Sequence, residues 1–381
     1  MRVLIAADIF PPVGGGPATY AAGFSNMVVE NGDEVTIISL TPDSDASVTK
    51  AQVVSVKQKN KLFKYLEYLG LLFKHAGQVD IIYAMGPVNA GLPAFFAAKL
   101  FGKKFVVKVV GDYAWEQGFQ RFGVIELIDE FQTKKYTGAT RCLQIIQKFV
   151  ARSADQVIVP SEYLKKIVIG WDVLADKVVV IYNAVKFDTV VQPIIKPDSE
   201  QWILTGARLV PWKGMKALIS VLKKLGPDFP NAKLKIIGEG PERKNLVDFA
   251  KTTGVADKVE FLGNVPNPEV LGYMQASEIF ILNSAYEGLS HMLVEALHAD
   301  CQVLASNVGG NTEVIIPGQT GLLFSYNNER EIEKNLREVL GGRRVSLLEN
   351  SDTREQFFGK FEFKVMVSKT TELLEKICGR S

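Results

Sequence analysis

The segment NSAYEGLSHMLVEAL, residues 283–297, decides how the second half of the chain folds. It follows the apolar run 279–282 and is typical of a strand end, a glycine-containing turn and a helix start. Glu287 lies in the turn and Glu295 on the helix. A helical rise of about 1.5 Å per residue separates these acids by roughly 10–12 Å. Paired glycosidase carboxylates lie about 5–9.5 Å apart, so we expect the two acids to bind different parts of one elongated ligand.

The composition indicates a globular protein large enough for two domains. The chain has 381 residues, of which 47% are apolar, and its basic residues exceed its acidic ones by only two. The basic residues are spread along the chain, so we expect no nucleic-acid partner. The three cysteines are odd in number and widely separated, which favours a reducing, cytoplasmic location over a disulfide framework.

The N-terminal half begins with a strand over 2–7, a glycine loop, a helix over 18–30 and a strand over 34–40. This order predicts a parallel sheet covered by helices. The loop glycines Gly14, Gly15 and Gly16 allow backbone N–H groups to approach an anion at the helix start. The dinucleotide-binding fingerprint is not met, because Thr19 stands where its last glycine belongs. We therefore expect a diphosphate rather than a nicotinamide cofactor here.

The segment GARLVPWKG, residues 206–214, offers a second anion site. It follows a predicted strand and precedes a predicted helix. Arg208 can make a forked contact with a phosphate and Lys213 adds a point charge. Two cations at this spacing suit a pyrophosphate.

These segments resemble those of a known enzyme family. The pattern Glu-Gly-Leu-Ser-x4-Glu over 287–295 resembles the Glu-x7-Glu signature of retaining glycosyltransferases with the GT-B fold, most of all glycosyltransferase family 4. Residues 206–214 resemble the family's Gly-x-Arg-Leu-x-x-x-Lys-Gly element, and 308–313 its Gly-Gly-x-x-Glu turn. The resemblance covers nearly the whole chain and is more specific in the second half.

The resemblance implies an α/β architecture of GT-B type, with two Rossmann-like, doubly wound parallel-sheet domains facing a cleft. We expect an acceptor-binding domain over 1–192 and a nucleotide-sugar donor domain over 198–360. The proline-flanked segment 193–197 is the expected linker. Residues 361–381 are expected to form a helix that packs back on the N-terminal domain.

The resemblance also assigns roles to individual residues. It implies that Arg208 and Lys213 neutralise the donor diphosphate, that Glu287 contacts hydroxyls of the donor hexose, and that Glu295 holds the ribose hydroxyls. The other donor-binding residues that it implies are Gly14, Gly15, Gly16, Gly263, Val265, Gly288, Leu289, Ser290, His291 and Met292.

The acceptor side departs from the family pattern. Many family members carry a functional histidine near the end of the strand predicted over 104–110, where this chain has Gly111 and Asp112. We expect Asp112 to hydrogen-bond an acceptor or donor hydroxyl, and Tyr113 or Trp115 to stack on a sugar. A capped loop with buried aromatic side chains explains the same three residues.

Neither a metal nor a cofactor is expected. Residues 43–45 spell Asp-Ser-Asp, but they belong to a predicted exposed loop. His291 and His298 lack a third ligand at suitable spacing. Residues 57–75 form a basic amphipathic pattern, explained either by core packing with a solvated face or by peripheral contact with the inner face of a membrane.

The sequence therefore predicts a retaining, metal-independent hexosyltransferase. Its donor would be a nucleoside diphosphate sugar, with UDP favoured and GDP the alternative, and its acceptor a hydroxyl of a sugar or lipid-linked glycan in cell-envelope polysaccharide synthesis. A GT-B nucleotide-sugar epimerase and an inactive nucleotide-sugar-binding partner subunit are the two rival interpretations.

Overall fold

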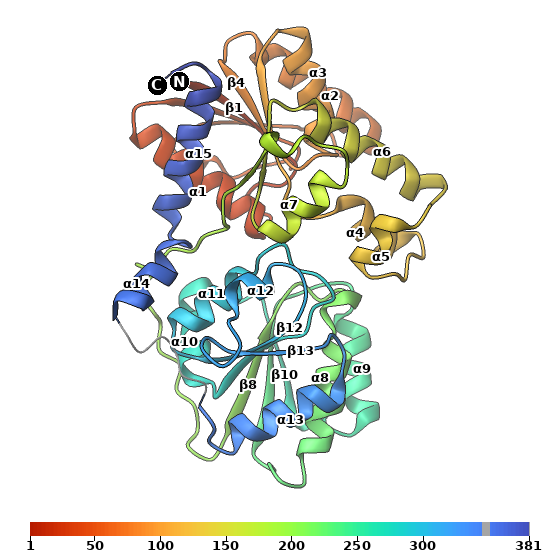
Figure 1. Cartoon of the computed structure of the whole chain (residues 1–381), viewed down its shortest axis with the longest axis vertical. Helices are drawn as coiled ribbons and strands as arrows, with labels where there is room; N and C mark the ends of the chain where they lie inside the picture. Colours follow the sequence, from red (N-terminus) through yellow and green to blue (C-terminus); the bar gives the residue numbers. More distant parts are fainter. Residues whose placement is uncertain (345–350, 381) are drawn as a thin grey trace. The chain divides into compact units, whose positions relative to one another are not determined.

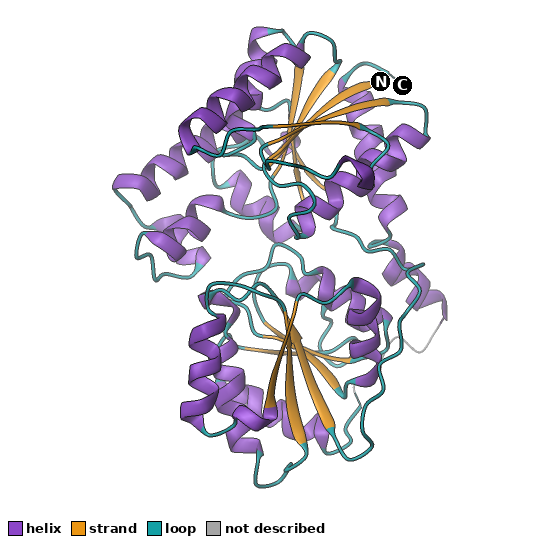
Figure 2. Cartoon of the chain, turned by 180° about the vertical axis from the view of Figure 1, so that it is seen from behind, coloured by secondary structure: helices purple, strands orange, loops and turns teal. Residues whose placement is uncertain are grey.

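The chain folds into two units, each built around one parallel β-sheet (Figure 1). The computed structural model describes residues 1–344 and 351–380. Unit 1 comprises Met1–Tyr182 together with the C-terminal segment from Lys364, and unit 2 comprises Asn183–Phe363. Helices cover both faces of each sheet (Figure 2). The predicted fold class, two Rossmann-like parallel-sheet units, is confirmed.

The sheet of unit 1 is entirely parallel, in the order β3-β2-β1-β4-β5-β6-β7. Its central strands are short apolar runs that are buried on both faces, as parallel sheets require. The strands are β1 (Arg2–Ala7), β2 (Glu34–Ser39), β3 (Gln52–Ser55), β4 (Ile81–Met85), β5 (Lys104–Lys108), β6 (Gln156–Val159) and β7 (Val178–Val180).

Several helices of unit 1 begin at capping residues that the sequence supplies. Asn60 accepts a hydrogen bond from the Leu62 amide at 3.0 Å, and Ser161 accepts one from Leu164 at 3.1 Å. The helices are α1 (Gly16–Glu30), α2 (Lys61–Ala76), α3 (Gly91–Leu100), α4 (Tyr113–Arg121), α5 (Ile128–Thr133), α6 (Gly138–Ser153), α7 (Glu162–Ile169) and α15 (Phe363–Ile377), with 3₁₀ turns η1 (Ala46–Val48) and η2 (Ala175–Lys177).

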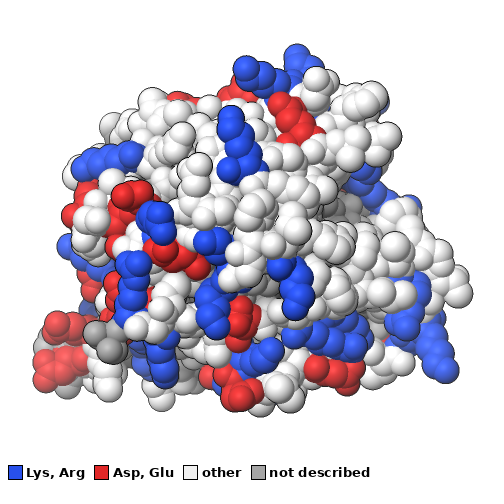
Figure 3. Space-filling view, turned by 90° about the horizontal axis from the view of Figure 1, so that it is seen from above, with Lys and Arg blue, Asp and Glu red and all other residues white. Residues whose placement is uncertain are grey.

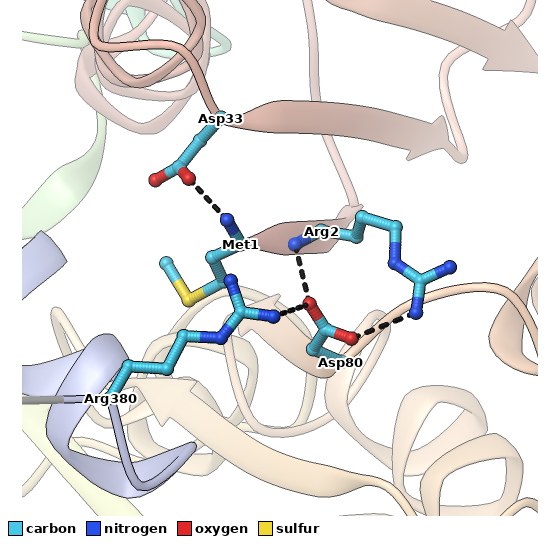
Figure 4. Close-up of polar contacts among 5 residues, drawn as sticks. All are labelled: Met1, Arg2, Asp33, Asp80 and Arg380. Carbon is cyan, nitrogen blue, oxygen red and sulfur yellow. Dashed lines mark hydrogen bonds and ion pairs between the residues drawn. The ribbon is translucent and has the colours of Figure 1, made fainter.

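Ion pairs tie the two ends of the chain together in unit 1 (Figure 4). The Asp80 carboxylate binds the Arg2 guanidinium at 3.0 Å and the Arg380 guanidinium at 2.9 Å. The N-terminal amine of Met1 pairs with Asp33. Arg380 lies three residues beyond the end of α15, so Asp80 links the segment after the C-terminal helix to the first strand.

Unit 2 has a six-stranded parallel sheet in the order β10-β9-β8-β11-β12-β13. Leucines and valines of α8 pack on the sheet and on α13 to form its core. The strands are β8 (Gln201–Gly206), β9 (Ala232–Ile237), β10 (Val259–Gly263), β11 (Ile279–Leu282), β12 (Gln302–Ser306) and β13 (Leu322–Phe324). The helices are α8 (Met215–Leu225), α9 (Arg243–Thr253), α10 (Asn267–Ala276), α11 (His291–His298), α12 (Asn311–Val314), α13 (Glu329–Leu340) and α14 (Ser351–Gly359), with η3 (Pro211–Lys213) and η4 (Ala256–Lys258).

Both sheets reverse their strand order next to their first strand. In unit 1, β1 lies between β2 and β4, and in unit 2, β8 lies between β9 and β11. Ligands of doubly wound folds bind outside the carboxyl ends of the strands at such a switch point. The β1/β4 and β8/β11 edges are therefore the places to look for sites.

Two boundaries differ from those expected. Unit 1 ends at Tyr182 rather than at 192, because the chain before 193 already packs on unit 2: the Gln192 amide donates to the Pro268 carbonyl at 3.0 Å. The capped loop considered for residues 112–115 is the start of helix α4, in which the Asp112 side chain accepts a hydrogen bond from the Trp115 amide.

No helix in the described part of the chain is long and apolar enough to cross a bilayer. Figure 3 shows one face of the molecule, on which Lys and Arg side chains are scattered among neutral and acidic ones.

Candidate functional site

The switch point of unit 2 brings together a lysine and a glutamate that are far apart in sequence. Lys213 ends η3 after β8, and Glu287 lies in the loop after β11. The Lys213 Nζ and the Glu287 Oε1 are 2.5 Å apart. The two side chains are 15% and 13% exposed, so each still reaches the surface of the edge. The structure thus unites two of the predicted site residues.

Hydrogen bonds fix both the carboxylate and the backbone of Glu287. Ser284 Oγ donates to Glu287 Oε1 at 2.7 Å, and the Ser284 amide donates to Ser306 Oγ at 3.0 Å. The Gly310 amide donates to the Glu287 carbonyl at 2.9 Å. Ser284 therefore holds the carboxylate, while Ser306 of β12 and the glycine turn after β12 hold the backbone that carries it, which preorganises the acid for a ligand.

The loops carrying Lys213 and Glu287 also hold each other in place. Asn283 Nδ2 donates to the Gly214 carbonyl at 2.9 Å, and the Ala285 amide donates to the Trp212 carbonyl at 2.8 Å. Gly214 has φ +56°, and a Cβ there would lie 2.3 Å from Asn283 Nδ2. Only glycine fits this position, so the sequence Lys213-Gly214 is explained by the close approach of the two loops.

Glu295 lies apart from the Lys213–Glu287 pair and contacts a different segment. It accepts a hydrogen bond from Asn267 Nδ2 at 2.9 Å. Burial raises the pKa of the Glu295 carboxyl, and the Asn267 bond opposes that rise. Asn267 begins α10 directly after the turn containing Gly263 and Val265. The structure thus places the turn with Gly263 and Val265, which was predicted to bind the donor, beside the acid predicted to hold the ribose hydroxyls.

Two further predicted features lie at this edge. Arg208 follows β8 and is exposed, and among the described residues it has no ion pair. Helix α11 begins at His291 rather than at the expected Leu289, with Ser290 as its N-cap and no side-chain cap hydrogen bond. The segment Gly288–Met292 forms the turn before α11 and the start of that helix. The backbone amides in the first turn of α11 are donors of the kind that bind phosphate oxygens.

The remaining predicted site residues belong to unit 1. Gly14 and Gly15 lie in the exposed loop between β1 and α1, Gly15 is the N-cap of α1, and the exposed Gly16 is its first residue. They are not part of the unit 2 edge.

Asp112 and Trp115 have structural roles that differ from the expectation. Asp112 is fully buried and accepts hydrogen bonds from the Trp115 amide at 3.0 Å and from the Gln132 and Gln147 side chains at 2.8 Å each. Trp115 is also fully buried, and its indole N–H donates to the Glu126 carbonyl. Neither side chain has a face open to a sugar, so the capped loop with buried aromatics describes them. Tyr113 remains partly exposed.

The two histidines of α11 do not converge on one group. His298 stacks on Phe187 with ring centroids 4.3 Å apart and meets Phe358 edge-on. Burial, followed by the Arg354 charge, lowers the pKa of its imidazole. Across residues 1–344 and 351–380, no group of three His, Cys, Asp or Glu side chains has metal-binding geometry.

Sequence reasoning missed the polar residues that support the acids. These are Asn267, Asn283, Ser284 and Ser306. The one available signal was the polar pair Asn283-Ser284 directly after the apolar strand 279–282, at a predicted sheet edge. Asn267 and Ser306 carry no such signal, because their contacts cross 28 and 22 residues of sequence.

Two Rossmann-like sheets, with a paired lysine and glutamate at the switch point of the second, define the class of GT-B glycosyltransferases. Sequence comparison agrees with this class. The family described as "Glycosyl transferases group 1" matches residues 187–356, and the "Glycosyl transferase 4-like domain" matches residues 15–184. The chain belongs to the GT-B glycosyltransferases of the family 4 type.

Curated relatives include two uncharacterized glycosyltransferases of Methanocaldococcus jannaschii. One is 25% identical over 404 residues, covering 98% of this chain and 97% of that protein. The other is 27% identical over 232 residues, and the match spans 60% of this chain and 62% of that relative.

Solved structures share the fold over the full chain. Sucrose-phosphate synthase from Thermosynechococcus elongatus superposes with a TM-score of 0.82 at 17% identity, covering 100% of this chain and 99% of that chain. Anabaena HepE in complex with UDP and glucose superposes with a TM-score of 0.78 at 18% identity, covering 98% and 99%.

Proposed function

We propose that the chain is a retaining hexosyltransferase that uses a nucleoside diphosphate sugar, with UDP favoured over GDP. The acceptor in this proposal is a hydroxyl of a sugar or of a lipid-linked glycan, in the synthesis of cell-envelope polysaccharide. The observation that carries the proposal is the Lys213–Glu287 pair at the β8/β11 switch point, braced by Ser284. A cation for a diphosphate and a carboxylate for sugar hydroxyls then lie side by side.

The donor assignment has two supports. The Asn267–Glu295 contact places a carboxylate beside the turn at Gly263, at a second position along the same edge. This arrangement suits a ligand with a sugar at one end and a nucleoside at the other. The structural neighbour HepE was solved with UDP and glucose, which matches such a ligand.

The proposed mechanism is a front-face displacement. The bond between the anomeric carbon and the diphosphate oxygen breaks, and the acceptor oxygen bonds to the same face of that carbon. Lys213, Arg208 and the first-turn amides of α11 stabilise the charge that develops on the departing diphosphate. A diphosphate oxygen takes the acceptor proton. Glu287 orients the hexose through its hydroxyls and forms no bond to it.

In this proposal the protein's own cations replace a divalent metal. Arg208 and Lys213 supply two positive charges at the diphosphate, the number that one bound Mg²⁺ supplies. The reaction is therefore expected to run in the presence of EDTA.

The test is a mass-spectrometric screen of UDP-, GDP- and ADP-hexoses with the purified chain, with and without EDTA and a membrane extract. We expect one nucleoside diphosphate to be released, with EDTA-resistant release that rises with extract. Glu287→Ala is expected to abolish transfer, whereas Glu355→Ala, an exposed acid of α14, is expected to keep it. Donor binding without turnover would overturn the proposal in favour of an inactive partner, and donor conversion without acceptor would favour an epimerase.

A retained anomeric configuration is checked on the isolated product by NMR. An inverted product, or a glycosyl group trapped covalently on Glu287, would contradict the front-face mechanism.

We also propose that α2 contacts a membrane surface. Three apolar side chains in its first turns, Leu62, Phe63 and Leu66, are 66%, 58% and 56% exposed. The same segment carries Lys61 and Lys64, and a cationic apolar face of this kind binds anionic lipid.

Sedimentation with vesicles tests the membrane contact. The chain is expected to bind phosphatidylcholine vesicles containing phosphatidylglycerol, and the double variant Leu62→Ser with Phe63→Ser to lose that binding. Leu174→Ser, which alters an equally exposed leucine of unit 1, is the matched control. Equal sedimentation of both variants would contradict the proposal.

A further inference from the structure

A polar cluster lies at the switch point of unit 1. Asp8 directly follows β1, and Asn89 lies between β4 and α3. β1 and β4 pair in parallel, so both residues leave the sheet at the same edge. Asn89 lies close enough to the Asp8 carboxyl for its side-chain amide to lower the pKa of that group. The cluster occupies the same place in its sheet as Lys213 and Glu287 occupy in theirs.

Two phenols complete the cluster from neighbouring helices. Tyr65 of α2 donates its hydroxyl to Asn89 Oδ1 at 2.8 Å. Asn89 Nδ2 in turn donates to the hydroxyl of Tyr113, the first residue of α4, at 3.0 Å. All four side chains are partly exposed. A carboxylate, a carboxamide and two phenols from four segments thus meet at a surface that solvent and a ligand can reach.

The charge in this cluster has no cationic partner among the described residues. None of the described ion pairs involves Asp8. Burial raises the pKa of its carboxyl, against the opposing bonds from the Ile9 amide and Asn89. Burial, with the nearby Tyr113 and Asp8, raises the pKa of Tyr65 to about 12. Tyr65 therefore stays a neutral donor, and the carboxylate retains lone pairs that only a hydrogen-bond donor can satisfy.

This chemistry suits a neutral polyol. Sugar hydroxyls both donate and accept, so they can bind a carboxylate, an amide and phenols together, and hydrogen bonds to a charged group are the stronger ones. A phosphate would be repelled by the uncompensated carboxylate. The unit 1 edge therefore favours an uncharged sugar, whereas the unit 2 edge with its cations favours a diphosphate.

We propose that Asp8, Asn89, Tyr65 and Tyr113 form the binding site for the acceptor sugar, with Asp8 accepting a hydrogen bond from an acceptor hydroxyl. The inference rests on the proposed transferase function and names the residues that select its acceptor. In this proposal the buried Asp112 and Trp115 are no longer acceptor contacts, whereas Tyr113 remains one.

The test is ligand-observed NMR of the full chain with a panel of methyl α- and β-D-hexopyranosides in the presence of UDP. At least one glycoside is expected to bind the wild type. Asp8→Asn keeps the shape of the side chain and removes its charge, and we expect it to weaken that binding about tenfold or more, the loss of one charge-assisted hydrogen bond. Asp45→Asn, a partly exposed acid in the loop after β2, is the matched control and is expected to bind as the wild type does.

Tyr113→Phe provides a second variant that removes one hydroxyl and leaves the ring in place. It is expected to weaken the same glycoside while leaving UDP affinity, measured by calorimetry, unchanged. Failure of every glycoside to bind the wild type, or equal binding by wild type and Asp8→Asn, would overturn the inference. If glycosides bind as expected but no nucleotide hexose is consumed, the proposed function fails and the sugar site stands.

Discussion

The two sheet edges satisfy their charged groups in opposite ways. At the edge of unit 2, Lys213 and Glu287 neutralise each other at 2.5 Å. At the edge of unit 1, Asp8 has an amide for a partner. Lys108, the last residue of β5, is buried against the Tyr20 ring at 3.8 Å with no hydrogen-bond partner in the described structure. The same topology thus carries a paired cation in one unit and unpaired charges in the other, which indicates edges built for different ligand chemistry.

Removing the paired lysine is expected to have the largest effect. Lys213→Ala leaves the Glu287 carboxylate without its cation. It also removes a positive charge that stabilises the departing diphosphate in the transition state. We expect kcat/KM for hexosyl transfer to fall about 10²–10³-fold. The measurement is release of nucleoside diphosphate under steady-state conditions.

The control for Lys213 is Lys216→Ala, which removes the same charge from an exposed position on α8. It is expected to stay near wild-type activity. Equal losses in the two variants would mean that the edge attracts the donor by general charge alone, and the comparison between the edges would lose its basis.

The unpaired lysine of unit 1 is expected to make stability depend on pH. Burial lowers the pKa of Lys108 to about 7 in the folded chain, whereas an unfolded lysine titrates near 10.4. Between these values the unfolded state binds a proton that the folded state lacks, so the free energy of unfolding rises with pH from about 7 to about 10. Below about 7 the full cost of the buried charge is present.

Lys108→Met removes that cost. We expect the variant to be more stable at pH 7, on the order of a few kcal/mol, and its stability to be flatter between about pH 7 and 10. Urea denaturation at several pH values measures both effects, with Lys99→Met, an exposed lysine of α3, as the control. A variant that is less stable at pH 7 would show that the contact with Tyr20 outweighs the burial.

The glycines of the two edges offer a third comparison, in stability alone. A Cβ at Gly310 would lie 2.2 Å from the Gly288 carbonyl oxygen, in the turn that holds Glu287, whereas a Cβ at Gly14 meets nothing within 4 Å. Gly310→Ala is therefore expected to destabilise the chain by about 1–3 kcal/mol, and Gly14→Ala to change it by less than about 0.5 kcal/mol. Denaturation followed by circular dichroism distinguishes them, and equal effects would show that the packed turn is free to shift.

Much of the fold could be predicted because it depends on local patterns. The strands 2–7 and 279–282 are apolar runs bounded by turn residues, and the C-terminal helix begins and ends where its periodicity does, at Phe363 and Ile377. Helix α4 was missed because its capping residue Asp112 and the aromatic residues that follow it also fit a capped loop.

The site could be predicted only where its residues lie in one motif. Lys213, Glu287 and Glu295 stand in recognisable segments, and in the structure the first two form an ion pair that the sequence did not predict. Asp8, Asn89 and Tyr65 could not be grouped from sequence, since they come from separate segments that only the strand order brings together. The sequence also could not show whether Asp112 faces a ligand or the core. In the structure it is buried, and the side chains of Gln132 and Gln147, which are distant in sequence, donate hydrogen bonds to it.

The smallest expected effect concerns the ion pairs that join the chain ends in unit 1. Asp80 pairs with Arg2 and Arg380, whose side chains are each 51% exposed, so solvent and salt screen both contacts. We expect Asp80→Asn to lower the free energy of unfolding by about 1 kcal/mol or less, and by less still at high salt. Asp176→Asn, an exposed acid with no described ion pair, is the control.

The pH dependence of this effect has the same sign as that of Lys108, because folding lowers both pKa values, but it lies at lower pH. Burial raises the pKa of Asp80, but the Arg2 amide and guanidinium and the Arg380 charge outweigh it and lower the pKa. The stabilisation is therefore present above the unfolded value near 3.9 and is lost as pH falls through the lower folded value. If Asp80→Asn matched the control at every pH and salt concentration, side-chain packing of α15 alone would hold the chain ends together.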